Sequence, residues 1–201
     1  LVERTGIDPG AEDDVIFGCT DPLGSQAGDL ARTAWLVAGM PDHVPGVTID
    51  RQCGSSQQAV HFAAQGVMSG TADLIIAGGV QNMSKIPISA AMIAGAEFGF
   101  TTPFAESPGW MARYGDQEVS QFRGAEMIAE KWDISRERME QFALESHERA
   151  AAAADEGRFD SQIVPLNGLA QDETIRRGTT LVKMASLNTL TEDGRLSAAV
   201  A

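Results

Sequence analysis

The chain has few of the residues on which metal centres and disulfide frameworks depend. Its 201 residues include three histidines and two cysteines. The histidines are widely scattered and no Cys-x-x-Cys pair occurs, so the sequence gives little support to a metal site. Cys19 and Cys53 make no disulfide framework and suit a reducing compartment. We therefore expect free thiols in a cytoplasmic protein.

Positive charge is also scarce. Lys and Arg number 15 against 28 Asp and Glu, which gives a formal net charge of −13. Nucleic acids and anionic membranes both bind basic surfaces, so we expect neither as a partner. A phosphate-bearing ligand would have to bind a local basic cluster. No apolar run approaches the roughly 20 residues that a membrane-spanning helix needs.

The first 84 residues alternate between strand and helix patterns. Short β-branched or apolar runs predict strands, and apolar residues at helical spacing predict helices between them. The expected elements are strands at 14–18, 46–50 and 73–79 and helices at 27–38 and 53–69. This order predicts an α/β fold with a parallel sheet and right-handed crossovers. Ligands of such sheets gather at the carboxyl ends of the strands.

Beyond residue 84 the periodicity fails and then returns as helix. Residues 85–117 are rich in Met, Gly and Pro, and their aromatic residues either pack a loop or line a ligand cleft. These aromatic residues are Phe98, Phe100, Phe104, Trp110 and Tyr114. A helix is expected at 122–132, and another from Ser135, a suitable N-cap, to about Gly157 with one buried apolar face. Two turn-rich, hairpin-like segments follow.

Cys53 lies at the junction between the second strand and the helix rich in small residues that follows it. A thiol at a helix N-terminus meets unpaired backbone N–H groups and the positive end of the helix dipole, which favour the thiolate. The thiolate is a nucleophile, and the same N–H groups can receive the oxyanion that forms when a carbonyl is attacked. On this pattern alone two interpretations stay open: a catalytic thiol, and the small buried hydrophobe that an ordinary free cysteine more often is.

No histidine is well placed to act as the base for this thiol. His61 is eight residues along the same helix, which is roughly 12 Å along the axis and outside hydrogen-bond reach. His43 precedes a strand and belongs at the opposite edge of the sheet. His147 lies close to the apolar stripe of the late helix, where a packed histidine is expected. Either the chemistry uses no histidine, or the base lies outside these residues.

Five segments of the chain resemble the thiolase family. They are RQCGSSQQA at 51–59, GTAD at 70–73 with AGGVQNMS at 77–84, the helix at 122–132, EGRF at 156–159, and DETIRRG at 172–178. The first is similar to the thiolase acylation motif. The resemblance covers essentially the whole chain in one order, so it is far more specific than the cysteine motif alone.

The resemblance implies a thiolase-like layered α/β/α core fragment with a loop-rich, partly helical insertion domain. Residues 1–84 would be the partial core, 85–196 the loop domain that covers coenzyme A, and 197–201 the start of a returning core strand. Cys53 would take an acyl group from a 3-ketoacyl-CoA, releasing acetyl-CoA, or catalyse the reverse Claisen condensation. Arg176, Lys183 and Gln121 would bind substrate. Lys183 and Gln121 differ in residue type from the family pattern.

The resemblance also implies partners and missing parts. Coenzyme A and acyl-CoA would be substrates, with no permanently bound cofactor and no metal, and the expected assembly is a homodimer or homotetramer. Residues 1–6 look like the end of a helix that begins upstream, and family motifs from the second core domain, including a histidine and a second cysteine, are absent. We therefore expect a thiolase truncated at both ends, with little turnover alone.

Two other interpretations stay open. A condensing ketoacyl synthase has the same architecture, although the segment QNMS at 81–84 and the loop insertion favour thiolase. A thiolase-derived domain that binds coenzyme A or a partner subunit without catalysis is the second. Residues 51–52 and 57–58 are more similar to degradative branches of the family, such as those of fatty acid β-oxidation, than to the branch that forms acetoacetyl-CoA.

Overall fold

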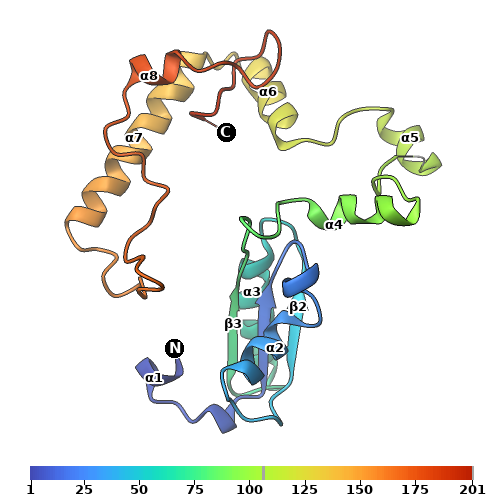
Figure 1. Ribbon diagram of the computed structural model, residues 1–201, viewed down its shortest axis with the longest axis vertical. Helices are drawn as coiled ribbons and strands as arrows, with labels where there is room; N and C mark the ends of the chain where they lie inside the picture. The colour runs from blue at the N-terminus through green and yellow to red at the C-terminus, as the bar shows by residue number, and fades with distance from the viewer. Residues whose placement is uncertain (106, 201) are drawn as a thin grey trace. The chain divides into compact units, whose positions relative to one another are not determined.

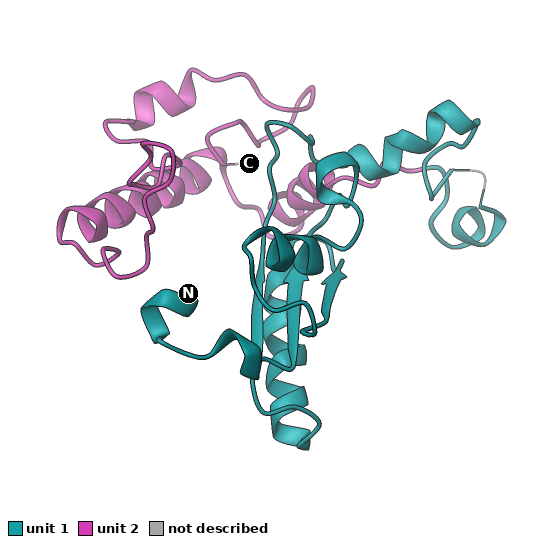
Figure 2. Cartoon of the chain, turned by 60° about the horizontal axis from the view of Figure 1, so that its bottom comes forward, with its two compact units in different colours: residues 1–116 teal, residues 117–201 magenta. Residues whose placement is uncertain are grey.

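The chain divides into two compact units, Leu1–Asp116 and Gln117–Ala201 (Figure 2). The structure is a computed structural model that describes residues 1–105 and 107–200. The predicted domain boundaries at residues 84 and 196 follow the family pattern, whereas the division after Asp116 follows compactness. Those boundaries stay a prediction.

Unit 1 is built on a parallel three-stranded sheet with the order β2-β1-β3 (Figure 1). The strands are β1 (Asp14–Gly18), β2 (Gly46–Ile49) and β3 (Ile75–Gly79), and the longer helices are α2 (Leu30–Val37) and α3 (Ser55–Ser69). Shorter helices are α1 (Val2–Thr5), η1 (Pro9–Ala11) and η2 (Gly24–Gln26). The α/β fold and the parallel pairing predicted from the sequence are confirmed.

The two long helices of unit 1 pack on opposite faces of this sheet. Val15 of β1 forms a buried cluster with Ala31 and Trp35 of α2, and Phe17 packs against the same cluster. Neighbouring side chains of a strand point to opposite faces. The other face therefore carries Gly18, which lies directly under the first turn of α3.

Helix α2 begins three residues later than the sequence pattern predicts. Asp29 is its N-cap, and the Asp29 carboxylate accepts from the backbone N–H of Arg32 at 3.4 Å. The same carboxylate accepts from the Thr48 hydroxyl at 2.9 Å, which ties the helix start to β2. The cap takes precedence over the apolar pattern because it satisfies a helix N–H group that would otherwise lack a partner.

Helix α3 buries one stripe of residues and exposes the rest. Ser55, Ala59 and Ala63, four residues apart, are buried. Val60 and Val67, which are apolar, are nevertheless 52% and 45% exposed. Among the described residues, the sheet covers one side of this helix.

Residues 85–116 carry short helices: α4 (Ala90–Ile93), η3 (Ala94–Phe98) and α5 (Pro108–Tyr114). Of the aromatic residues in this stretch, Trp110 packs between Phe104 and Tyr114, with ring centroids 4.7 and 4.6 Å apart. Phe98 and Phe100 are 78% and 70% exposed. The three packed rings agree with the loop-packing interpretation.

Unit 2 contains α6 (Gln121–Lys131), α7 (Arg136–Asp155) and α8 (Leu181–Ala185). The predicted N-cap is confirmed, because the Ser135 side chain accepts from the backbone N–H of Arg138. Helix α8 was not predicted from the sequence. Isolated antiparallel bridges join Leu166 to Leu169 and Thr189 to Ser197. Residues 198–200 form a turn, so the returning core strand expected there stays a prediction.

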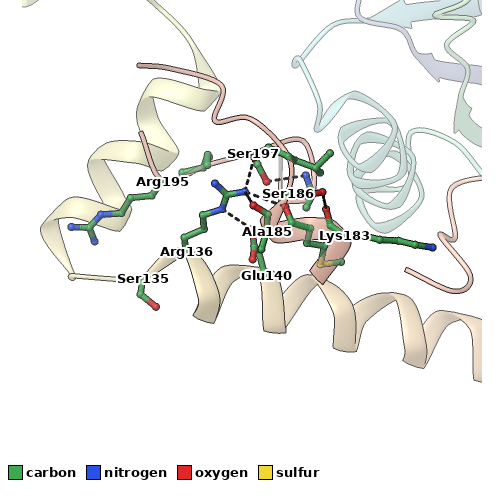
Figure 3. A network of polar contacts seen from close by, with 12 residues as sticks. Ser135, Arg136, Glu140, Lys183, Ala185, Ser186, Arg195 and Ser197 are labelled. Atoms are coloured by element: carbon green, nitrogen blue, oxygen red, sulfur yellow. Dashed lines mark hydrogen bonds and ion pairs between the residues drawn. The ribbon is translucent and has the colours of Figure 1, made fainter. Parts of the chain in front are cut away.

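Charged side chains hold the segments of unit 2 together by binding backbone groups (Figure 3). Arg136 donates to the Glu140 carboxylate at 2.7 Å and to the carbonyl oxygens of Met184, Ala185 and Leu187 at 3.1, 3.3 and 2.7 Å. These carbonyls belong to the end of α8 and the residues after it. Glu140 is 3% exposed. The ion pair thus attaches α8 to the start of α7.

The apolar side of α7 is open instead of buried. Met139, Phe142 and Ala143 line a groove of about 830 Å³ together with residues of α6 and the segment near Leu196. Phe142 is 74% exposed. Glu140 is the buried residue of this helix. The predicted buried face is wrong here because nothing in the described part of unit 2 covers it.

No helix among residues 1–105 and 107–200 is both long enough and apolar enough to cross a membrane.

Candidate functional site

Cys53 lies in an exposed turn between the carboxyl end of β2 and the start of α3. The helix begins at Ser55, two residues later than predicted, so the thiol precedes the helix instead of opening it. Gln52, immediately before the cysteine, has a φ of 50°, in the left-handed region that few non-glycine residues adopt. Such a conformation persists only where neighbouring contacts enforce it.

Hydrogen bonds on both sides enforce this turn. The Ser55 hydroxyl accepts from the backbone N–H of Arg51 at 2.8 Å and donates to the carbonyl of Gln52 at 2.6 Å. The Asp50 carboxylate accepts from the backbone N–H of Gln52 at 2.7 Å. The backbone N–H of Ser55 also donates to the Gln52 carbonyl, at 3.1 Å. Gln52 is therefore bound at both its N–H and its C=O.

Two glycines let the turn approach the sheet. A methyl group on Gly18 would lie 2.4 Å from the Ser55 carbonyl carbon and from the Ser56 nitrogen. A methyl group on Gly79 would lie 2.8 Å from the Gly18 oxygen and from Ser56 Cβ. Gly18 and Gly79 are partners in the β1–β3 register, so together they form a flat surface, here called the glycine floor. Only glycine allows backbone to approach this closely.

The amino end of α3 keeps free hydrogen-bond donors. The N-cap residue Gly54 provides no side-chain cap. Among the described residues, the backbone N–H groups of Ser56 and Gln57 have no acceptor. Such donors, with the dipole of a helix of 15 residues, favour negative charge next to Cys53. They suit a thiolate or the oxyanion of an attacked carbonyl.

The second cysteine is structural. Cys19 follows β1, is 2% exposed, and its Sγ lies 3.4 Å from Oε1 of Gln81. Both cysteines are free thiols, as predicted. Asp21, also buried, accepts from the backbone N–H groups of Ser89 and Ala91 at 3.2 and 2.9 Å. Its carboxylate thereby attaches the segment after β3 to the loop after β1.

In the described part of unit 1, the two imidazoles lie away from the turn of Cys53. Nε2 of His43 lies 3.0 Å from the carbonyl oxygen of Gly10, at the amino side of β2. His61 is exposed on α3, two turns beyond the thiol. A search of residues 1–105 and 107–200 finds no cluster of His, Cys, Asp and Glu that could hold a metal ion.

In unit 2 the structure brings Arg176 and Lys183 into one segment. The Lys183 ammonium donates to the carbonyl of Gly178 at 3.1 Å, two residues after Arg176. The guanidinium of Arg177 binds Asp155 at 2.8 and 3.0 Å, and this pairing lowers the pKa of the aspartate. The Arg176 guanidinium has no partner among the described residues. Of the two adjacent arginines, Arg176 is thus the one available for an anion.

Two further candidates, His147 and Gln121, also lie in unit 2. His147 accepts the backbone N–H of Arg176 at Nδ1, at 3.3 Å, so this imidazole holds the arginine segment against α7. Gln121 is the exposed first residue of α6, after the N-cap Ser120. The structure shows no contact between Gln121 and the segment of Arg176 and Lys183 in the described residues.

Comparison with known proteins decides the family. A family model described as the thiolase N-terminal domain matches residues 1–201. The chain belongs to the thiolase family. Its parallel sheet, with helices on both faces, is the core from which this fold is built.

Relatives of this thiolase chain differ in what their names say. The steroid 3-ketoacyl-CoA thiolase FadA6 of Mycobacterium tuberculosis is 59% identical over 204 residues, covering 100% of this chain and 50% of the relative. A 3-ketoacyl-CoA thiolase of Pseudoalteromonas translucida is 38% identical, over 93% of this chain and 48% of the relative. The chain thus spans about half the length of the curated relatives it matches.

A solved structure agrees with this family. The crystal structure of the Bacillus anthracis acetyl-CoA acetyltransferase matches with a TM-score of 0.73 at 30% identity. The match covers 98% of this thiolase chain and 52% of the crystallised one. The match therefore supports the thiolase fold for the elements of unit 1 and for those of unit 2.

Sequence reasoning missed the supports of the candidate site. Ser55 was noted only as one of the small residues of the helix, and Gly18 and Gly79 only as the last residues of predicted strands. A strand that ends in glycine next to a helix start is the signal that could have found them. Nothing in the sequence pattern pointed to Arg136 and Glu140.

Proposed function

We propose that this chain carries Cys53 as the nucleophile of an acyl-CoA acyltransferase. The observation that carries the proposal is the exposed Cys53 in the turn just before the uncapped start of α3, in a chain matched to the thiolase N-terminal domain along its whole length. The reaction is thiolytic cleavage of a 3-ketoacyl-CoA, or its reversal as a Claisen condensation.

The proposed step begins with attack of the Cys53 thiolate on the C3 carbonyl of the substrate. The carbonyl oxygen takes the negative charge, and N–H donors at the helix start stabilise it. The C2–C3 bond then breaks, its electron pair stays on C2, and protonation of C2 yields acetyl-CoA. The acyl group remains as a thioester on Cys53. A second coenzyme A thiol loses its proton, attacks this thioester and releases the Cys53 thiolate.

The proton transfers need groups that unit 1 does not place beside the thiol. His43 is bound to the carbonyl of Gly10, and His61 lies along α3. We therefore expect acylation of Cys53 to be easier for this chain than complete turnover. A chain that binds coenzyme A without catalysis is the second candidate function, and this lack of a neighbouring base is the observation that favours it.

Arg176 and Lys183 are proposed to bind the phosphates of coenzyme A. The chain carries a net charge of −13, so a phosphate ligand needs a local cation whose charge is not already neutralised. Arg176 meets this requirement because the neighbouring Arg177 takes the aspartate. Lys183 adds a second cation in the same segment, and Gln121 is proposed as a polar contact to the substrate.

The substrate is proposed to be a degradative 3-ketoacyl-CoA. The name of the relative that is 59% identical specifies a steroid 3-ketoacyl-CoA, which favours bulky, ring-derived acyl groups over short ones. A homodimer or homotetramer in the cytoplasm, with no permanently bound cofactor, completes the proposal. Thiolysis assays with ring-derived, long-chain and acetoacetyl thioesters of coenzyme A would rank the three classes.

Peptide mass spectrometry after exposure to a 3-ketoacyl-CoA tests the proposed nucleophile. We expect an acyl adduct on Cys53, none on the buried Cys19, and none in Cys53→Ala. Cys19→Ala is the matched control and should still be acylated. A chain shown to be folded by circular dichroism that forms no adduct would contradict the acyltransferase proposal and leave the binding domain.

A further inference from the structure

We propose that Ser55 is a positioning residue for Cys53. Its buried hydroxyl, seated on the glycine floor, fixes the backbone of residues 51–53 and so holds the thiol at the amino end of α3. This inference rests on the proposed function, in which Cys53 is the nucleophile. Ser55 is 4% exposed, so it acts through the turn and not by touching substrate.

The Ser55 hydroxyl joins both ends of the strained turn. It accepts the N–H of Arg51 at 2.8 Å and donates to the carbonyl of Gln52 at 2.6 Å, which uses its single proton and one acceptor position. Between these two bonds the chain passes through the left-handed conformation of Gln52. Without the hydroxyl, the Asp50 carboxylate on the N–H of Gln52 would be the remaining side-chain restraint.

The glycine floor makes this restraint directional. The backbone of Ser55 is packed so closely on Gly18 that a methyl group there would lie 2.4 Å from the Ser55 carbonyl carbon. This packing leaves Ser55 no space to move toward the sheet. The hydroxyl therefore holds the turn from within while the sheet backbone limits it from below. Released from the hydroxyl, residues 51–53 lose a restraint on the side away from the sheet, and we expect the thiol to be held less closely at the amino end of α3.

Ser56 offers a matched comparison. It is the next residue of α3, is exposed, and its Cβ also lies over the glycine floor. Its hydroxyl makes no hydrogen bond in the described part of the chain. Ser55→Ala and Ser56→Ala therefore delete the same atom at adjacent positions, and only the first deletion removes a contact of the Cys53 turn.

The test is alkylation of the 201-residue chain with iodoacetamide, followed at each cysteine by peptide mass spectrometry. At pH 7 we expect Ser55→Ala to slow labelling of Cys53 about two- to fivefold, the range of one helix-terminus interaction with a charge. At about pH 9.5, where ordinary thiols are ionised, the two rates should converge. Ser56→Ala should label like the unaltered chain.

Cys19 serves as an internal measure of folding, because it is buried in the same unit. The proposal requires Cys19 to stay protected in Ser55→Ala while Cys53 slows. Labelling of Cys19 in that variant would overturn the proposal, because the hydroxyl would then support the whole unit. Equal Cys53 rates in the two alanine variants would also overturn it.

A second measurement separates this inference from the proposed function. The rate of acyl-adduct formation from a 3-ketoacyl-CoA should fall at least about tenfold in Ser55→Ala, because misplaced reacting groups lose rate steeply. If the unaltered chain forms no adduct at all, the acyltransferase proposal fails, yet the alkylation rates still decide the role of Ser55. If adducts form equally in both alanine variants, the acyltransferase proposal stands and the positioning role is wrong.

Discussion

The turn of Cys53 in unit 1 and helix α8 in unit 2 are held in different ways. In unit 1, backbone lies directly on backbone: the turn of Cys53 rests on Gly18 and Gly79 with no room for a methyl group. In unit 2, long charged side chains reach backbone carbonyls, as Arg136 does at the end of α8 (Figure 3). The first arrangement fixes a position closely and tolerates no added atom. The second is adjustable and depends on charge.

This difference follows the chemistry proposed for each unit. A nucleophile has to be held within a fraction of an ångström, because reaction rate falls steeply with misplacement. Cationic contacts to phosphate act over longer distances and tolerate movement. The unit proposed to carry the nucleophile is thus the rigidly packed one, and the unit proposed to carry the phosphate contacts is held by flexible charged side chains.

The largest effect is expected from Gly18→Ala. The added methyl group would meet two backbone atoms at 2.4 Å, and backbone cannot rotate aside as a side chain can. We expect unit 1 to lose about 3 kcal/mol or more of its unfolding free energy. Urea unfolding combined with hydrogen exchange would measure this, with loss of Cys19 protection as a second readout.

The control for this change is Gly109→Ala in α5 of the same unit. A methyl group at Gly109 meets nothing within 4 Å. Its unfolding free energy should stay close to that of the unaltered chain. If both variants unfold alike, close backbone approach is not what holds the Cys53 turn, and the contrast between the units fails.

The fold of unit 1 could be predicted because its signals are local. The strand of Asp14–Gly18 and the helix that ends at Ser69 are visible in the pattern of apolar residues alone. Buried and exposed sides were harder: Val60 and Val67 fit an apolar stripe, yet the described residues supply nothing to cover them. Whether a helix face is buried depends on the element that packs against it, and the apolar pattern of the helix alone does not identify that element.

The candidate site could be predicted only in part for the same reason. Cys53 was found because a thiol at a strand-to-helix junction has a recognisable local pattern. Its support by Ser55 depends on where a hydroxyl points, and the floor depends on the pairing of Gly18 with Gly79, 61 residues apart in sequence. The roles of Cys53, Arg176, Lys183 and Gln121 stay predictions for the experiments above to decide.

Glu140→Ala is the corresponding test of unit 2. The change removes the partner of Arg136 and leaves the guanidinium beside the carbonyls of α8. We expect unit 2 to lose about 2 kcal/mol, the range for hydrogen bonds to charged groups. Hydrogen exchange should show the loss first in residues 181–187.

Glu145→Ala on the same helix is the matched control. Glu145 pairs with Arg149 on an exposed face of α7, where solvent screens the pair, so its loss should change stability little. Equal effects of the two alanine variants would mean that helix propensity, and not the link to α8, accounts for the change.

A smaller effect on the stability of unit 1 is expected from changing a buried carboxylate, that of Glu12. Both oxygens of Glu12 are buried without a hydrogen-bond partner in the described residues. Burial, with a lesser contribution from the charge of Asp13, raises the pKa of Glu12. The folded chain therefore holds this proton more tightly than the unfolded chain, and stability falls as pH rises from the ordinary pKa of a glutamate through the raised one.

Glu12→Gln should remove that loss. We expect it to raise the unfolding free energy of unit 1 by up to about 1 kcal/mol near pH 8 and to change nothing near pH 4. Unfolding measured across this pH range, with Glu3→Gln at an exposed position as control, would show it. A gain that is constant across the range would contradict the titration of Glu12 as its cause.

The smallest expected change in stability comes from two glycines that have open space around them. At one of them the backbone conformation requires glycine, and at the other it does not. Gly124 lies inside α6, has no atom within 4 Å of an added methyl group, and needs no left-handed conformation. Gly124→Ala should stabilise unit 2 by about 0.5 kcal/mol, since alanine restricts the unfolded chain and favours helix. Gly168→Ala has equally open space but a φ of 86°, so it should destabilise the same unit. Urea unfolding of the two variants should give changes of opposite sign. Changes of the same sign would show that free space alone, and not backbone conformation, decides whether alanine is tolerated at these two positions. At Gly18 in unit 1, by contrast, we expect the lack of space to decide it.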